Sequence, residues 1–438
     1  MVDQVQKDLR RVVRMHCMYP FRDLFDGIVH YVNRGVYAAN GGNFTVLNQP
    51  LPDHFLTDVH RHDLGASVYL ELYGEGCMFT RALDTPLFID RLRVEAKRCT
   101  LVLQPFIVSK AAIELVAAVP GMTLAGSRFN LVEKINNKLF ARQLFEKVGM
   151  DLLQGNICKS EQEIRNAAAR LRRSGVRQMA LIDPSPYAAS GKGLIGRTTI
   201  SSDDRTYEMQ LQGILQPYSR SYRNLSVILT EWSDEVVSSP SVIGYIDAQR
   251  RVNFIATTSQ VFEGVGSPVY RGSIIPAQES PEVILDLYRC FTAIANQLVK
   301  RDWVGVFGID FIVVRSGTGV RVIPTEINGR YTGSMYLANA MRRLPPHDWF
   351  GYCLNVAVPL GTTYCELRTA IELVSDRPSE KVLAFNVGPL HLGKSTVMVL
   401  IDPSREQKPR QRAEVIFDEI EHLLSPLRKQ QYYELAAS

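Results

Sequence analysis

The sequence contains no long apolar run and no compact cysteine pattern. No apolar stretch reaches the roughly 18 residues that cross a bilayer, so we expect no membrane-spanning segment. The first residues, MVDQVQKDLRR, lack the apolar core of a signal peptide. The seven cysteines are scattered and odd in number, without a C-x-x-C pair. These features predict a cytoplasmic protein whose thiols are reduced.

Charge and histidine patterns exclude further classes of protein. The 50 basic and 45 acidic residues give a net charge of +5 without a dominant basic run, so the sequence predicts no nucleic-acid partner. A mildly basic chain suits anionic substrates. The eight histidines show no zinc spacing, although His60 and His62 stand close together. Catalytic Cys–His pairing stays an alternative that nothing in the sequence favours.

The most informative stretch is the segment from Val304 to Met335. Two apolar runs flank Ser316-Gly-Thr-Gly319, which predicts a β-hairpin. If a three-residue loop joins the strands, Asp310 falls opposite Glu326 and Gly308 falls opposite Asn328. Side chains alternate along a strand, so Asp310, Glu326 and Asn328 share one face.

This face of the predicted hairpin suits a hard cation. Like charges directly opposite each other are unfavourable unless a cation lies between them. Carboxylate and amide oxygens suit Mg²⁺ that carries nucleotide phosphates. Arg330 continues the alternation and offers a two-pronged donor for a phosphate or carboxylate. A charged, solvent-facing strand is the alternative. The apolar opposite face, containing Phe307, Ile309 and Phe311, favours a packed element instead.

Asp310 followed by Glu326-Ile-Asn328-Gly-Arg330 resembles the metal-binding signature of the ATP-grasp superfamily. The resemblance implies that Asp310, Glu326 and Asn328 hold Mg²⁺ against the phosphates of ATP. The longer run Glu-Ile-Asn-x-Arg-Tyr-Thr-Gly is similar to that of the pheganomycin-type peptide ligases, which also have a C-terminal extension. The implied fold is α/β (α+β), with the ATP-grasp architecture.

Three domains are expected. Thr100–Val108, a helix capped by Ser109 and Met122–Ala125 form a strand–helix–strand unit, which predicts a parallel sheet in residues 1–125. This segment carries no G-x-G-x-x-G and matches the domain that commonly precedes the ATP-grasp domain. The nucleotide- and metal-binding domain is expected at 126–345, and a C-terminal extension without assigned chemistry at 346–438.

Several residues upstream of the hairpin are candidates for holding ATP. Lys138 stands near the start of an amphipathic helix, and the resemblance implies that it contacts phosphates, although a solvated lysine is the ordinary interpretation. Ser190-Gly191-Lys192-Gly193 is a glycine-flanked turn whose spacing is not that of a P-loop. The resemblance implies that Gly191, Lys192 and Gly193 close over the phosphates.

One position departs from the family pattern. Asp183-Pro184 stands where a second nucleotide lysine is usual. Either Asp183 faces away and Lys192 or Arg197 replaces the missing lysine, or the assumed register is wrong.

The segment Glu231-Trp232-Ser-Asp234 follows an apolar strand. The resemblance implies that its backbone pairs with adenine and that an acid there binds ribose; an ordinary strand end is the alternative. Arg271, in Tyr270-Arg-Gly-Ser, is a candidate that could face a phosphoryl group or a substrate carboxylate. Arg271 and Arg330 are thus the predicted catalytic residues.

The implied reaction joins a carboxylate to an amine, with amino acids or peptides as small-molecule substrates. ATP phosphorylates the carboxylate, and the amine displaces phosphate from the acyl phosphate. Positioning and charge neutralisation dominate such chemistry. Another ATP-grasp reaction, such as a carboxylation, and a non-catalytic nucleotide-binding protein are the alternatives. The substrate identities and the oligomeric state, with a homodimer as one option, stay open.

Overall fold

The computed structural model describes residues 10–24, 27–39, 41–187, 193–222, 225–264, 267, 269–345, 348–375 and 377–425. Its contacts divide the chain into two compact units. Unit 1 is built from residues 1–129, 271–278 and 330–438, and unit 2 from residues 130–270 and 279–329. The domain boundaries expected after residues 125 and 345 stay predictions.

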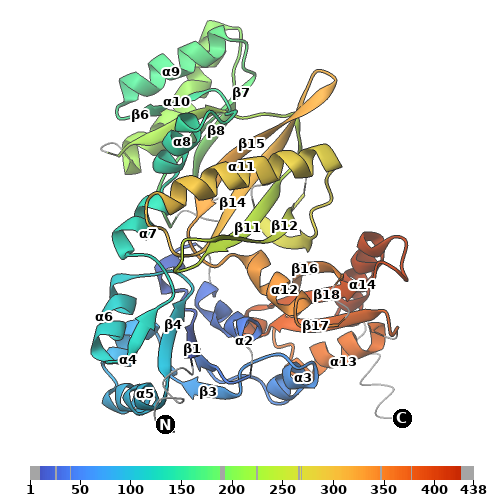
Figure 1. The fold of residues 1–438 in the computed structure, drawn as a ribbon. Coiled ribbons are helices and arrows are strands. Elements are labelled where there is room, and N and C mark those ends of the chain that lie inside the picture. The colour runs from blue at the N-terminus through green and yellow to red at the C-terminus, as the bar shows by residue number, and fades with distance from the viewer. Residues whose placement is uncertain are drawn as a thin grey trace. The chain divides into compact units, whose positions relative to one another are not determined.

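The N-terminal part of unit 1 is a parallel sheet with the strand order β3-β2-β1-β4-β5. The predicted parallel sheet is thereby confirmed, and Ser109 caps its helix by accepting from the Ala112 N–H. Figure 1 shows this sheet and its helices in blue to cyan. The elements are β1 (Arg10–Met15), η1 (Tyr19–Phe21), η2 (Ile28–Arg34), α2 (Gly35–Ala38), β2 (Phe44–Leu47), α3 (Phe55–Arg61), β3 (Val68–Glu71), α4 (Met78–Leu83), α5 (Pro86–Arg98), β4 (Thr100–Pro105), α6 (Lys110–Ala118) and β5 (Met122–Leu124).

The remaining part of unit 1 is an antiparallel sheet in which β16 and β17 both pair with β18. Strand β18 lies in the core of this sheet, because it is buried from Ser395 to Ile401 and most of these residues are apolar. The elements are β13 (Tyr270–Ile275), which pairs with β16, then α12 (Gly333–Met341), β16 (Phe350–Ala357), α13 (Tyr364–Val374), β17 (Glu380–Asn386), η3 (Leu390–Leu392), β18 (Lys394–Ile401) and α14 (Pro409–Leu423).

Unit 2 begins with two helices and a small antiparallel sheet of order β6-β9-β7-β8. Helices α9 and α10 cover this sheet with a cluster of buried side chains that includes Ile164, Leu171 and Leu215. The elements are α7 (Phe129–Asn136), α8 (Lys138–Lys147), β6 (Gly155–Cys158), α9 (Glu161–Arg173), β7 (Gln178–Ile182), β8 (Leu194–Thr199), α10 (Asp204–Ser221) and β9 (Val227–Glu231). The glycine turn was predicted between β7 and β8, but Gly191 and Lys192 lie outside the described residues.

The second sheet of unit 2 contains the predicted hairpin. Strand β14 pairs with β10, β11 and β15, and β11 pairs with β12. Helix α11, yellow in Figure 1, packs against β11, β12 and β15. Ser280 caps its first turn by accepting from the Val283 N–H, and Pro281 stands at the first helical position. The elements are β10 (Val236–Ser238), β11 (Pro240–Ile246), β12 (Val252–Phe262), α11 (Pro281–Val299), β14 (Gly305–Ser316) and β15 (Gly319–Asn328).

Within the described ranges, no helix has the length and apolar character of a membrane span.

Candidate nucleotide and metal site

The β14–β15 hairpin brings the three predicted metal ligands together. Asp310 pairs with Glu326, and Gly308 pairs with Asn328, as predicted. The Asn328 Nδ2 donates to Asp310 Oδ2 at 2.9 Å and lies 3.2 Å from Glu326 Oε1. The three side chains therefore share one face. The opposite face is core, because Phe307, Ile309 and Phe311 are at most 1% exposed.

The register at the site is correct although the predicted loop is wrong. Ser316 pairs with Gly319, so the turn contains two residues, Gly317 and Thr318, and Gly317 has a positive φ of 59°. The pairing then shifts by one between Asp310 and Phe311, which leaves Thr325 as the extra residue of a β-bulge. The Thr325 hydroxyl donates to the Asp310 carbonyl at 3.1 Å. The extra residue in the bulge offsets the shorter turn, so Asp310 still lies opposite Glu326.

Two polar residues that the sequence did not single out support Asp310. Ser241 of β11 lies directly opposite Asp310 and donates through Oγ to Asp310 Oδ1 at 2.6 Å. Gln260 of β12 donates to Ser241 Oγ at 2.7 Å. These bonds fix the orientation of the Asp310 carboxylate. Neither residue belongs to a recognisable motif, since their role depends on strand neighbours that lie far apart in sequence.

Lys138 lies next to the carboxylates, and its contact with ATP phosphates, which the resemblance implied, stays a prediction. Its Nζ is 2.7 Å from Glu326 Oε2, and the two side chains are only 17% and 23% exposed. The paired asparagines before it explain this placement. Asn137 caps α8 by accepting from the N–H groups of Leu139 and Phe140, which places Lys138 at the first helical position. The predicted amphipathic helix is thus confirmed as α8, and the helix α7, which ends just before it at Asn136, was not predicted.

Asn136 ties the same turn to the end of β15. Its Oδ1 accepts from the Gly329 N–H at 3.0 Å, and its Nδ2 donates to the Gly329 carbonyl at 3.3 Å. A Cβ at Gly329 would lie 2.6 Å from the Trp303 ring, so only glycine fits there. The residue beside the predicted metal ligands is held rigidly from both sides.

The donor set fits a hard divalent cation. Two carboxylates and an amide that can present its oxygen are oxygen ligands of the kind Mg²⁺ prefers. The Lys138 ammonium, 2.7 Å from Glu326, shows that the carboxylate attracts a cation from its own chain. Among the described residues, no group of three or more His, Cys, Asp and Glu side chains could hold a metal by itself. A third protein ligand at this place would therefore have to come from the amide of Asn328.

The adenine-side candidates lie at the end of β9. The Glu231 N–H donates to the Gln154 carbonyl at 2.7 Å, and the Trp232 N–H donates to the Gln178 carbonyl at 2.9 Å. The Gln178 side chain donates to Asp234 Oδ1 at 2.5 Å. These contacts hold the segment that was predicted to pair with adenine and ribose. The roles of Glu231, Trp232 and Asp234 stay predictions.

Asp183 turns its carboxylate onto its own loop. Its Oδ1 accepts from the Ser185 N–H at 2.8 Å, and its N–H donates to the Gly193 carbonyl at 2.7 Å. Pro184 accepts from the Lys138 N–H at 3.1 Å. The Arg197 guanidinium, one candidate for the missing lysine, lies 5.1 Å from the centre of the Trp232 ring. The carboxylate thus serves a local turn, as the first of the two alternatives for Asp183 requires.

The two predicted catalytic arginines belong to unit 1. Arg271 NH2 donates to the Asn355 carbonyl at 3.1 Å and lies 3.7 Å from a carboxylate oxygen of Glu421. The Arg330 guanidinium lies 5.3 Å and 5.8 Å from the ring centres of Phe21 and Phe106. The metal ligands and Lys138 belong to unit 2. Within unit 1 the two arginines contact different residues, and their catalytic roles stay predictions.

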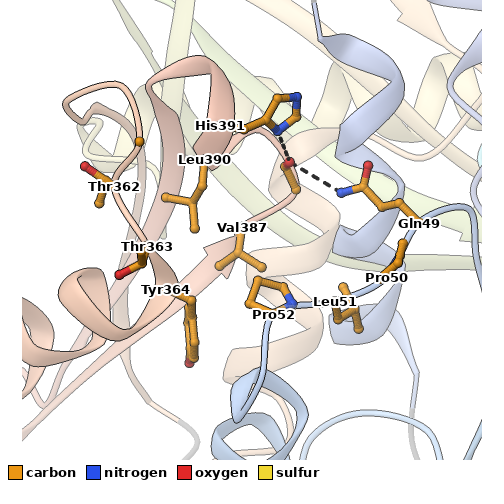
Figure 2. Close-up of a pocket in the computed structure, with 12 residues that line it drawn as sticks. Gln49, Pro50, Leu51, Pro52, Thr362, Thr363, Tyr364, Val387, Leu390 and His391 are labelled. Carbon is orange, nitrogen blue, oxygen red and sulfur yellow. Dashed lines mark hydrogen bonds between the residues drawn. The ribbon is translucent and has the colours of Figure 1, made fainter.

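A hollow in unit 1 contains none of the predicted site residues. It has a volume of about 540 Å³ and is lined by residues 49–52, 361–364, 387, 388, 390 and 391 (Figure 2). Gln49 and His391 both lie within hydrogen-bond distance of the Gly388 carbonyl, at 3.3 Å and 3.2 Å. No Lys, Arg, Asp or Glu is among the residues that line the hollow.

One nucleotide signature in this region is accidental. Gly388 to Ser395 reads GPLHLGKS, which matches the P-loop spacing. A P-loop leads from a strand into a helix, but here the segment leads into strand β18. The Ser395 hydroxyl donates to the Asn386 carbonyl at 2.9 Å and is buried. The segment therefore lacks the context that binds phosphates.

Comparisons with known proteins bear on the fold. No protein-family model matches the chain. It is 27% identical over 281 residues to the [butirosin acyl-carrier protein]–L-glutamate ligase of Niallia circulans, covering 63% of the chain and 61% of the relative. It is 27% identical over 310 residues to the L-propargylglycine–L-glutamate ligase of Streptantibioticus cattleyicolor, covering 65% of the chain and 61% of that relative. The chain thus matches about three fifths of the length of each relative.

The solved structures identify the fold. The ADP complex of an N5-carboxyaminoimidazole ribonucleotide synthetase has a TM-score of 0.57 at 12% identity and covers 96% of this chain and 98% of its own. A biotin carboxylase from Campylobacter jejuni has a TM-score of 0.57 at 9% identity and covers 98% of both chains. The chain therefore has the ATP-grasp fold, as the sequence predicted.

Proposed function

We propose that the chain is an ATP-dependent ligase that joins a carboxylate to an amine through an acyl phosphate. The observation that carries the proposal is the group of Asp310, Glu326, Asn328 and Lys138 on an ATP-grasp fold. Both curated relatives have names of ligases, and both names contain L-glutamate. L-Glutamate is therefore the first substrate to test, as either the carboxylate or the amine.

The residues of the chain divide the work by position and charge. Asp310, Glu326 and Asn328 would hold Mg²⁺, which when bound neutralises charge on the phosphates. Lys138 adds a positive charge beside the same carboxylates. Ser241 and Gln260 hold the Asp310 carboxylate in one orientation, so it needs little reorganisation during the reaction. Arg330 and Arg271 would face the transferred phosphoryl group or the substrate carboxylate.

Protein side chains provide no covalent intermediate in this scheme. The substrate carboxylate attacks the γ-phosphorus, ADP leaves, and the amine then attacks the acyl carbon and expels inorganic phosphate. Such chemistry depends on alignment and on stabilising negative charge. A carboxylation would use the same first step with bicarbonate as the carboxylate, so it is the second candidate. The names of the solved neighbours favour it, but those neighbours are at most 15% identical.

The nucleotide product and the second substrate test the proposal. The purified chain is incubated with ATP, Mg²⁺ and pairs drawn from a panel of amino acids that includes L-glutamate. The expected products are ADP, phosphate and an amide, with release that depends on both amino acids. AMP and pyrophosphate would indicate an adenylating enzyme instead. Turnover that needs bicarbonate and not an amino acid would support the carboxylation, and ATP binding without turnover would support a non-catalytic protein.

A further inference from the structure

A row of polar side chains crosses one face of the parallel sheet of unit 1. Arg14 of β1 pairs directly with Thr45 of β2 and with Gln104 of β4. Residues that lie opposite each other on neighbouring strands point to the same face. Three polar side chains therefore form a row across the three central strands, on a face that is otherwise packed.

The row lies where α/β sheets bind ligands. Arg14 and Gln104 are the last residues but one of β1 and β4, which end at Met15 and Pro105, and Thr45 pairs with Arg14 from β2. The chain runs from β1 outward to β2 and β3, and then continues on the other side of β1 with β4 and β5. The direction of winding thus changes between β1 and β4. Open parallel sheets bind ligands outside the carboxyl ends at such a switch point.

Several polar atoms of the row lack hydrogen-bond partners among the described residues, although the Gln104 side chain is hydrogen-bonded to Tyr331. Arg14 is 7% exposed, and its Nε and NH1 atoms make no hydrogen bond there; the same holds for Thr45 Oγ1, Gln104 Oε1 and the Nε2 of buried His16. Buried polar groups are nearly always paired, because an unpaired one loses its hydration without replacement. Four side chains with unpaired polar atoms in one place indicate that a bound molecule supplies the missing hydrogen-bond partners.

The cluster is positively charged and contains no described acid. The Arg34 guanidinium lies 5.3 Å from the centre of the Tyr336 ring. The Tyr336 hydroxyl is hydrogen-bonded to His16 Nδ1 at 2.7 Å. Arg343 donates to the carbonyls of Ala38 and Ala39. Arg14, Arg34 and Arg343 form no ion pair with a described carboxylate within 4.0 Å, although most other buried arginines in proteins do so.

Burial and like charge act on these groups together. Burial, with Arg343 nearby, lowers the pKa of Arg14 to about 10, although Tyr331 opposes the shift. Burial and the charges of Arg14 and Arg34 lower the pKa of His16 to about 3. The cluster is therefore short of negative charge in this form of the protein.

We infer that the Arg14 cluster, defined as Arg14, His16, Arg34, Thr45, Gln104 and Arg343, binds a carboxylate of a small-molecule substrate that takes no part in bond formation. A carboxylate accepts two parallel hydrogen bonds from a guanidinium and would also compensate the buried charge. Gln104 and Thr45 offer an amide and a hydroxyl beside it. Arg34 is only half-buried, which leaves the cluster a side from which a ligand can enter. The inference rests on the proposed function, since it assigns one end of a ligase substrate.

The test measures binding without ATP, so it does not depend on turnover. The thermal midpoint of the full chain is measured with L-glutamate, L-aspartate, L-glutamine, L-asparagine and inorganic phosphate. The dicarboxylic amino acids are expected to raise the midpoint in proportion to the logarithm of their concentration, and their amides to do so at least tenfold more weakly. A chain without any ligase activity can still pass this test, which separates the failure of the inference from that of the proposed function.

Arg14→Met is the decisive variant, with Arg10→Met as its control at the exposed start of the same strand. Replacing an uncompensated buried charge by an apolar side chain of similar length is expected to raise the midpoint without ligand and to abolish the shift with L-glutamate. Arg10→Met is expected to change neither. Arg34→Gln, at the half-buried edge, keeps the test valid if Arg14→Met does not fold, and is expected to weaken binding about tenfold.

Three outcomes would overturn the inference. In one, Arg14→Met or Arg34→Gln responds to L-glutamate as the wild type does. In the second, no carboxylate of the panel stabilises the wild type. In the third, phosphate alone stabilises it through Arg14, which would assign the cluster to a phosphorylated ligand.

Discussion

Replacing Glu326 by glutamine removes one charge from the candidate metal site and changes almost nothing else. Glutamine has the same shape and can still accept from Asn328, whose Nδ2 lies 3.2 Å from Glu326 Oε1. The apolar face of the hairpin is not touched. The variant therefore separates the charge of residue 326 from its contribution to packing.

The effect on stability follows from two opposing interactions of Glu326. Its Oε2 lies 2.7 Å from Lys138 Nζ, and it stands opposite the Asp310 carboxylate. At an effective dielectric constant of about 20, unit charges about 4 Å apart interact by about 4 kcal/mol. The lost attraction and the relieved repulsion are of similar size, so the free energy of unfolding is expected to change by on the order of 1 kcal/mol.

The effect on turnover is expected to be much larger. Loss of one preorganised charge that acts on the transition state lowers kcat by about 10²–10³-fold. The assay follows ADP release against total Mg²⁺ at fixed ATP, and the variant is expected to require more Mg²⁺ as well. Glu146→Gln is a matched control, because Glu146 is also paired with a basic residue of α8, Arg142, at 3.2 Å, but is 53% exposed. Wild-type turnover and Mg²⁺ dependence in Glu326→Gln would refute the assignment of the metal site.

Two further predictions concern unit 1. Arg330→Lys keeps the charge but loses the planar guanidinium near Phe21 and Phe106, so kcat is expected to fall by about 10²–10³-fold while ATP affinity changes little; steady-state kinetics with a separate ATP-binding measurement would contradict this if kcat were near normal. His16 has a folded pKa of about 3 against an ordinary 6.5, so the unfolded state takes up the proton first and stability falls as the pH drops below 6.5. The loss is expected to reach about 1.4 kcal/mol per pH unit, and chemical denaturation at pH 7 and pH 5 should show it in the wild type and much less in His16→Gln; an equal loss in both would show that His16 does not titrate in this way.

The parts of the fold that depend on local pattern could be predicted from the sequence. The helix caps at Ser109 and Ser280 and the hairpin from Gly305 to Asn328 follow from short-range signals. The common face of Asp310, Glu326 and Asn328 follows from the alternation of side chains along strands. The register at Asp310, however, was correct only because two differences cancel. The predicted loop is one residue longer than the observed turn, and the observed strand has one extra residue in a bulge that was not predicted.

Non-local features could not be predicted in the same way. Strand β1 reads RRVVRM, and its three arginines hide the period of a strand, because the sheet buries Arg14 against the ordinary preference for exposure. Ser241 and Gln260 reach Asp310 only after β11 and β12 have paired beside β14. No single segment of the chain carries that information.

Unit 1 is built from three separate segments of the chain, and this has a consequence for synthesis on the ribosome. Residues 10–129 contain the parallel sheet, but Tyr37 donates to the Ala384 carbonyl at 2.6 Å, and Arg343 donates to Ala38 and Ala39. The partners of these early residues are translated only after the whole of unit 2, whose segments end at Gly329. Chains grow by about 5–20 residues per second, so the early sheet waits for seconds with part of its surface uncovered. Unit 2 can complete its own contacts first, and a nascent chain is expected to be most vulnerable to aggregation and proteolysis in its N-terminal segment.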